Sequence, residues 1–167
     1  MNTAPPPPLL DAHCHYHDAR LLPWRAEFLA ELPALGVQRA VVNGTRPDDW
    51  SAVAALAAQV PWVLPSFGLH PWHVNERRPE WRDTLLRFLD THPGAGVGEI
   101  GLDRWIEGHD VAAQSECFRA QLAIAAERNL PATIHCIRAW CALWEILREC
   151  ALPLRGFLLH AYGGPAE

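Results

Sequence analysis

The sequence lacks any apolar run that approaches the roughly 20 residues needed to span a bilayer. Its first ten residues are rich in proline and contain neither a basic start nor the apolar stretch of a secretory signal. We therefore expect a cytoplasmic protein that has no association with a membrane.

Cysteine pairs with C-x-x-C spacing are also missing. The chain has five cysteines, which are Cys14, Cys117, Cys136, Cys141 and Cys150. An odd number without paired spacing argues against both a disulfide framework and a thiolate zinc site. We interpret them as reduced and mostly buried thiols.

An excess of positive charge is absent as well. The formal net charge is −5, so the chain has no general electrostatic attraction to nucleic acid. A phosphate substrate would have to be bound by local charge or by metal. The 167 residues, 50% hydrophobic and 20% charged, describe one globular domain that is long enough to bury a substantial core.

Short apolar runs alternate with segments of helical periodicity along the whole chain. The runs predicted as strands are residues 9–15, 39–43, 63–69, 96–102, 131–136 and 155–160. The segments predicted as helices are residues 24–35, 50–60, 79–90, 112–129 and 140–150, and Asp48 or Asp49 is the expected N-cap of the second. This alternation predicts a parallel sheet covered by helices, either an open doubly wound sheet or part of a barrel.

Polar residues that can carry chemistry end five of the six predicted strands. They are His13 and His15, His70, Glu99, His135, and His160. Because barrel enzymes place their chemistry at the carboxyl ends of the strands, this repetition favours a TIM-like (β/α) barrel. A complete barrel has eight strands and about 250 residues, so we expect an incomplete one with about six of the eight parallel strands. Residues 1–8 are interpreted as a proline-rich tail and residues 9–167 as the partial barrel.

The first strand ends with two histidines in the segment DAHCH. The period of two in a strand puts His13 and His15 on the same side, where they can bind one cation. A single histidine at a strand end is more often solvated or hydrogen-bonded, but a pair on one face favours a metal site. His17 follows the same spacing and is interpreted as a surface residue.

Glu99 lies between glycines in an apolar strand. A buried carboxylate must be paired, protonated or bound to metal, and a structural salt bridge is the ordinary alternative. Since His135 and His160 end the next two strands in the same way, we favour metal. Four histidines and one carboxylate exceed the needs of one tetrahedral ion, which predicts two divalent ions (zinc, manganese or magnesium) bridged by Glu99. Such a centre activates water, so hydrolysis is the expected reaction.

Five segments resemble those of TatD-like metal-dependent deoxyribonucleases in order and approximate spacing. They are DAHCH, GLHPWH, GEIGLD, QSECFRAQLAIAAERNLPATIH and FLLHAYGG, which together span residues 10–164. The metal ligands implied by the resemblance are His13 and His15 for one ion, Glu99 as the bridge, and His135 and His160 for the other. The resemblance also implies that His70 lies in the substrate pocket, and that the substrate is DNA or another phosphate ester.

We therefore predict catalytic roles for Glu99 and His70, and substrate contacts for His70, Arg138 and Trp72. Trp72 is the only tryptophan at the predicted rim. The tryptophans at positions 24, 50, 81, 140 and 144 lie on helical stripes and are expected in the core.

Three departures from the family pattern limit the resemblance. The family's aspartate at the end of strand eight, in a T-D-[SA]-P segment, is not in this sequence, which ends before a seventh strand. Arg138 stands one place later than the family's H-x-R, and the serine after the strand-six histidine is lacking. We expect a truncated chain that exposes the edges of its first and sixth strands, associates or stays partly unfolded, and has weak or no turnover. Its oligomeric state is left open.

Two other functions fit the same residues. The barrel could hydrolyse a small amide, lactone or phosphate ester, as amidohydrolase-like enzymes do, although a lysine in place of Glu99 would favour that class more. Alternatively, the chain is a non-catalytic metal-binding remnant whose barrel is completed by a partner.

Overall fold

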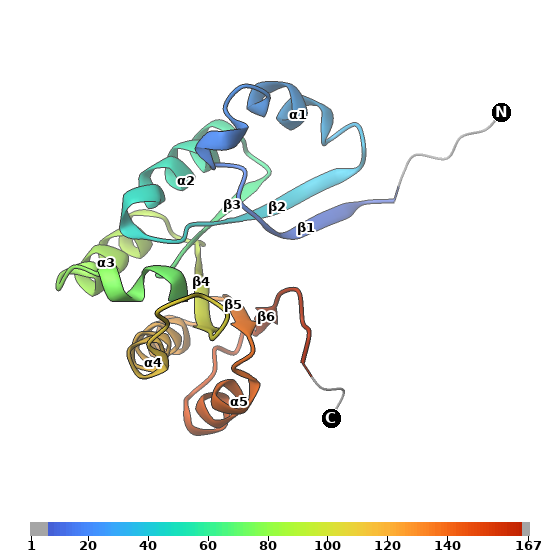
Figure 1. Ribbon diagram of the computed structural model, residues 1–167. Helices are drawn as coiled ribbons and strands as arrows, with labels where there is room; N and C mark the ends of the chain where they lie inside the picture. Colours follow the sequence, from blue (N-terminus) through green and yellow to red (C-terminus); the bar gives the residue numbers. More distant parts are fainter. Residues whose placement is uncertain (1–6, 165–167) are drawn as a thin grey trace.

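A six-stranded parallel sheet organises the computed structural model, which describes residues 7–164 (Figure 1). The strands are β1 (Leu9–Cys14), β2 (Val37–Asn43), β3 (Val63–Phe67), β4 (Gly96–Asp103), β5 (Ala132–Ile137) and β6 (Phe157–Leu159). They follow one another in the sheet in chain order. A doubly wound sheet reverses its strand order at a switch point, so this order excludes that architecture and confirms part of a TIM-like barrel. The predicted tail falls almost entirely outside the described residues.

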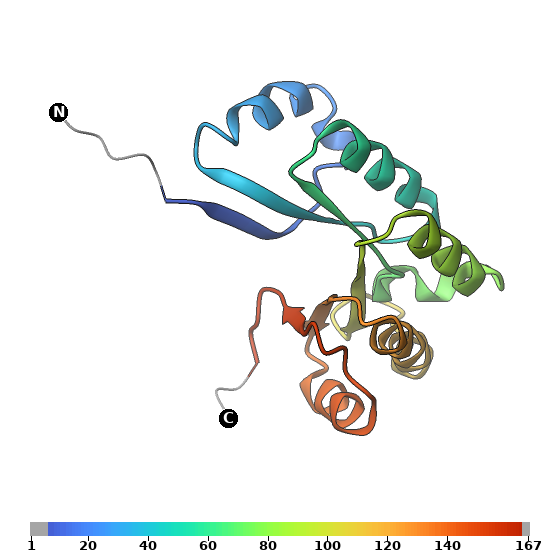
Figure 2. The same ribbon diagram turned by 180° about the vertical axis from the view of Figure 1, so that it is seen from behind.

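Five helices connect the strands and cover one side of the curved sheet (Figure 2). They are α1 (Arg25–Glu31), α2 (Pro47–Gln59), α3 (Trp81–Thr91), α4 (Val111–Glu127) and α5 (Trp140–Glu149). Two short 3-10 helices, η1 (Ala19–Leu21) and η2 (Pro71–Glu76), had no counterpart among the predicted elements. Both follow the carboxyl end of a strand and therefore shape the rim. The part of the chain that the structure describes contains no helix long and apolar enough to cross a membrane.

The predicted N-cap of α2 was wrong. The helix begins at Pro47 with Arg46 as its cap residue, because Pro at the first position needs no hydrogen-bond partner for a backbone N–H. Asp49 is the third helical residue instead, and its carboxylate accepts hydrogen bonds from the backbone N–H groups of Thr45 and Arg46. This turn joins the end of β2 firmly to the helix.

Strand β4 is the most deeply buried element, with all eight residues buried. Trp50, Phe67 and Phe88 form an aromatic cluster where α2 and α3 pack on β3, with ring centroids 5.1 to 6.4 Å apart. The expected core positions of Trp50 and Trp81 are confirmed, whereas Trp24, the cap residue before α1, is 61% exposed and was wrongly expected in the core. The core thus fixes β4 as the rigid base from which site residues project.

Strands β1 and β6 form the two edges of the sheet. Among the described residues no backbone pairing joins them, and Leu9 and Leu10 on β1 are 48% and 59% exposed. The edges therefore lie where they were predicted. Association of the chain in solution remains a prediction.

Candidate metal centre at the rim of the sheet

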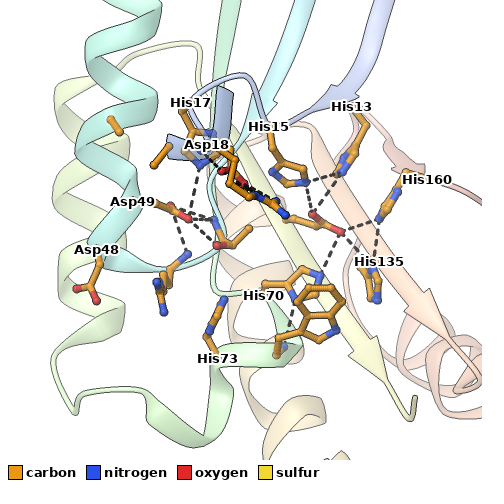
Figure 3. Close-up of a pocket in the computed structure, with 17 residues that line it drawn as sticks. His13, His15, His17, Asp18, Asp48, Asp49, His70, His73, His135 and His160 are labelled. Atoms are coloured by element: carbon orange, nitrogen blue, oxygen red, sulfur yellow. Dashed lines mark hydrogen bonds and ion pairs between the residues drawn. The ribbon is translucent and has the colours of Figure 1, made fainter. Parts of the chain in front are cut away.

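Five imidazoles converge on the carboxylate of Glu99 (Figure 3). Oε2 of Glu99 lies 3.3 Å from Nε2 of His13 and 3.2 Å from Nε2 of His15. The contacts of Oε1 are Nε2 of His70 at 3.3 Å, Nδ1 of His135 at 3.1 Å and Nε2 of His160 at 2.7 Å. The structure therefore brings together all the residues that the sequence suggested as ligands, and places His70 with them.

Each of these side chains belongs to a strand or to the residues that follow its carboxyl end. His13 lies in β1, Glu99 in β4 and His135 in β5, while His160 directly follows β6. Pairing of β4 with β5 is irregular between Val97 and Ile100, at the position of Glu99. Irregular pairing of this kind re-aims a side chain, and here Glu99 is only 2% exposed and central to the cluster.

Asn43 at the end of β2 orients the two histidines of β1. Its backbone carbonyl lies 2.8 Å from Nδ1 of His15, and its side-chain amide nitrogen lies 3.1 Å from Nδ1 of His13. Both Nδ1 atoms are therefore engaged on the far side of the rings. Nδ1 of His15 can donate to the carbonyl, as the second nitrogen of a ligating histidine commonly does, so its Nε2 presents a lone pair toward Glu99. Nδ1 of His13 would donate in the same way with the Asn43 amide turned over, since Oδ1 of that amide is buried without a partner within the described residues.

Two groups of three side chains have ligand atoms close enough to hold a metal ion. One contains His13, His15 and Glu99, and the other His70, Glu99 and His135, with the atoms of each group within 4.8 Å of one another. Glu99 belongs to both groups, as a bridging carboxylate would. Imidazole and carboxylate donors fit zinc or manganese, so the side chains present are chemically suited to divalent ions.

The electrostatics of the cluster favour an ionised Glu99. Burial raises the pKa of its carboxyl, but hydrogen bonds from the surrounding imidazoles, His13 first, outweigh burial and hold the pKa far below the usual range. Burial lowers the pKa of His135, yet its bonds to Glu99 and Asp103 leave that pKa raised. For His70 burial prevails and lowers the pKa to about 4, so this imidazole is neutral near pH 7.

A pocket of about 730 Å³ opens above the cluster. It extends from His135 and His160 past Arg20 in η1 to Arg46, the cap residue of α2. Trp72 forms part of its wall and is 51% exposed, and its contact with substrate stays a prediction. The pocket is large enough to hold several groups of an extended substrate beyond the reacting one.

Arg138 is not among the residues that line this pocket within residues 7–164. Its backbone has a φ of 54°, and its guanidinium lies 4.0 Å above the ring of Trp105. Trp105 is 64% exposed and follows the end of β4, so the pair lies at the surface of the protein there. The predicted contact between Arg138 and substrate stays a prediction.

The sequence interpretation missed Asp103 and misjudged His17. Asp103 ends the motif GEIGLD, is fully buried, and faces His135 at 2.9 Å. Glu99 was recognised as a carboxylate within an apolar strand, and Asp103 has the same feature and could have been recognised in the same way. His17 was expected at the surface but is 8% exposed, because its ring turns inward and Nε2 lies 3.6 Å from the carboxylate of Asp49.

Comparisons with known proteins agree with this geometry. A family model described as TatD related DNase matches residues 10–167. The 3'-5' ssDNA/RNA exonuclease TatD of Erwinia tasmaniensis is 33% identical over 130 residues, which cover 77% of this chain and 50% of that protein. The Cut9-interacting protein scn1 of Schizosaccharomyces pombe is 27% identical over 202 residues, covering 84% of this chain and 58% of that protein.

Among solved structures, the TatD homolog YJJV from Escherichia coli K12 superposes with a TM-score of 0.84. It shares 28% sequence identity, and the match covers 94% of this chain and 61% of that one. The chain therefore spans about half the length of the TatD exonucleases that it matches.

Proposed function

This chain belongs to the TatD-related DNase family, and from that premise we propose that it is a divalent-metal-dependent hydrolase that cleaves phosphodiester bonds in DNA. The observation that carries the proposal is the buried Glu99 carboxylate surrounded by five imidazoles at the floor of a pocket. A structural salt bridge would need one cationic partner for Glu99. Five convergent imidazoles have the composition of a metal centre.

We assign His13 and His15 to one ion, His135 and His160 to a second, and Glu99 to both. When bound, two such ions would activate water for attack and neutralise charge that develops on a phosphoryl oxygen. Zinc or manganese suits these imidazole donors better than magnesium alone.

His70 fits a substrate-binding role better than a metal-binding one. Its Nδ1 accepts a hydrogen bond from the backbone N–H of Trp72 at 3.1 Å. A neutral imidazole has one protonated nitrogen, so the proton of His70 is on Nε2, which faces Glu99 at 3.3 Å. A protonated Nε2 can donate to an oxygen of a phosphoryl group, but it has no lone pair for a metal ion. We propose that His70 holds substrate against the centre, as the sequence interpretation suggested.

The rim of the pocket supplies what an extended substrate needs. The indole of Trp72 is a flat surface on which a base can stack, and bases of every kind offer such a face. Arg20 and Arg46 lie farther along the pocket, where they could meet flanking phosphates.

We also propose that residues 9–167 act as one hydrolase domain in the cytoplasm, after a proline-rich segment at 1–8.

Metal titration combined with a hydrolysis assay tests this function. Calorimetry with zinc should give two ions per native chain, and Glu99→Gln should abolish this binding. In manganese, a labelled single-stranded oligonucleotide should be cleaved slowly by the native chain, faster than a panel of amides and lactones, and not by Glu99→Gln.

The matched control is Glu145→Gln, which makes the same chemical change on α5 away from the centre. It should behave like the native chain. Absence of zinc binding would refute the proposed metal centre. Cleavage of amides alone would show that the substrate is an amide and not DNA. Zinc binding without any hydrolysis would show a non-catalytic metal-binding protein.

A further inference from the structure

The carboxylate of Asp103 contacts four groups at once. Its Oδ1 accepts hydrogen bonds from the backbone N–H groups of Trp105 at 2.7 Å and Ile106 at 3.2 Å. Its Oδ2 accepts one from the indole Nε1 of Trp72 at 2.7 Å and lies 2.9 Å from Nε2 of His135. Asp103 is fully buried, so no water competes for these positions. The carboxylate is therefore held in one orientation.

Three of these four partners are groups that can only donate. Backbone and indole N–H groups have no acceptor lone pair, and an ionised carboxylate can only accept. The fourth partner, His135, must match this arrangement by carrying a proton on Nε2. His135 lies between two carboxylates, with Nε2 2.9 Å from Oδ2 of Asp103 and Nδ1 3.1 Å from Oε1 of Glu99. Because Asp103 is fixed by its three other donors, we assign the proton of the neutral ring to Nε2, which leaves Nδ1 unprotonated. The lone pair of His135 thus faces the centre.

The same oxygen holds the wall of the pocket. Trp72 is half exposed, and its only hydrogen bond from the indole within the described residues goes to Asp103. The indole also meets the ring of His70 edge to face, with centroids 4.8 Å apart. A displacement of the Asp103 carboxylate would therefore act on both His135 and Trp72.

We propose that Asp103 is a positioning residue that fixes the proton of His135 and the place of Trp72 through one oxygen atom. The inference rests on the proposed role of His135 as a metal ligand. It adds a residue outside the ligand set that determines whether His135 can bind metal at all, and it links the metal centre to the surface that meets substrate. Outer carboxylates that orient ligating imidazoles commonly change metal affinity by roughly 10- to 100-fold.

The first test needs no substitution. In the metal-free chain at about pH 9, well above the ordinary pKa of histidine near 6.5, ring nitrogen NMR should show His135 protonated on Nε2 and unprotonated on Nδ1. The opposite tautomer, or a mixture of both, would overturn the proposal. This result does not depend on nuclease activity.

The second test reverses the donor pattern. In Asp103→Asn the amide oxygen is expected to keep the two backbone N–H groups, which turns the amide NH₂ toward His135. His135 must then accept at Nε2 and carry its proton on Nδ1. We expect zinc affinity to fall by roughly 10- to 100-fold and the NMR signature to invert.

The matched control is Asp110→Asn, which removes the same charge at the exposed N-cap of α4, where asparagine caps as well as aspartate. It should retain native zinc affinity. Equal zinc affinity in Asp103→Asn and the native chain would refute the positioning role. A near-ultraviolet spectrum that differs from the native one would mean that Asp103→Asn does not fold correctly. In that case the tautomer of His135 in the native chain decides whether Asp103 is a positioning residue.

A third variant separates the two partners of Asp103. Trp72→Phe removes the indole donor but leaves the contact with His135, so zinc affinity and the tautomer should stay native while binding of a short single-stranded oligonucleotide weakens severalfold. A loss of zinc affinity in this variant would contradict the assignment of the His135 proton to Asp103. Should the chain bind no oligonucleotide, the nuclease proposal fails while the zinc and NMR results still decide the role of Asp103.

Discussion

Nε2 of His160 lies 2.7 Å from Oε1 of Glu99, although 61 positions separate the two residues in the sequence. The ring of His160 also stacks on that of His13, with centroids 3.9 Å apart and an interplanar angle of 5°. These contacts connect β1 and β6, the two edges of the sheet. Side chains around Glu99, rather than backbone pairing, thus bring the edges together at the rim.

Gly101→Ala should destabilise the fold strongly. Gly101 has a φ of 139°, and a Cβ atom there would overlap the carbonyl oxygen of His135 on the neighbouring strand. Backbone strain and overpacking together cost about 3 kcal/mol or more, measured as the free energy of unfolding in urea. Gly94→Ala is the control, because its φ of 94° brings the strain but no atom lies within 4 Å of the added carbon. A similar loss in both variants would contradict this explanation.

Gln121→Leu should loosen the segment that carries His70. The buried amide of Gln121 accepts from the backbone N–H of Leu69 at 2.7 Å and donates to the carbonyl of Leu69 at 3.2 Å. Leucine would leave both backbone groups unsatisfied, which costs about 2 kcal/mol of unfolding free energy. Gln59→Leu, at an exposed position near the end of α2, should change it by no more than about 0.5 kcal/mol.

The contacts of Asp49 should make stability depend on acidity. Burial raises the pKa of its carboxyl, but contacts from His17 and Thr45 prevail and hold the pKa below the ordinary 3.8. The unfolded chain therefore takes up the proton first, so the stabilisation is complete above pH 3.8 and is lost as pH falls through the lower folded pKa. Unfolding free energy measured against pH should fall over this acidic range. In Asp49→Asn, the decrease in unfolding free energy that comes from Asp49 at acidic pH should disappear. The control Asp48→Asn should show the same decrease as the native chain.

The cysteines should differ sharply in reactivity. Burial raises the pKa of Cys117 and of Cys136 to about 11, so their thiolates are scarce at pH 8. Cys141 is exposed on α5. A thiol reagent should modify Cys141 rapidly in the folded chain and all five cysteines after unfolding. Cys141→Ser should abolish the rapid phase, and rapid modification of Cys117 or Cys136 would contradict the burial described.

The sequence was sufficient to predict the sheet and the ligand cluster, because both follow from local periodicity. Each strand is a short apolar run, and the carboxyl ends of parallel strands meet at one rim, which brings His135 and His160 to Glu99. The spacing of two likewise placed His13 and His15 together. The 3-10 helices have no such periodicity, and neither was predicted.

Contacts between separate elements were beyond the reach of periodicity. His17 follows the spacing of His15, but its burial depends on Asp49 of the next helix, which no pattern in its own segment reveals. The contact of the Arg138 guanidinium with the ring of Trp105 likewise joins two separate segments, and the periodicity of neither segment indicates it. Asp103 stands in the motif GEIGLD, yet the donors around its carboxylate, such as Trp72 and His135, come from separate segments of the chain.

Because the strands lie in the sheet in chain order, each β/α unit can dock on its predecessor as it leaves the ribosome. The two groups of ligand residues therefore emerge in the same order. The trio of His13, His15 and Glu99 is complete once β4 has emerged, while the ligands proposed for the second ion, His135 and His160, emerge later. The order of synthesis would thereby set the order in which cations are acquired, with the bridging carboxylate already occupied on one side when the later ligands arrive.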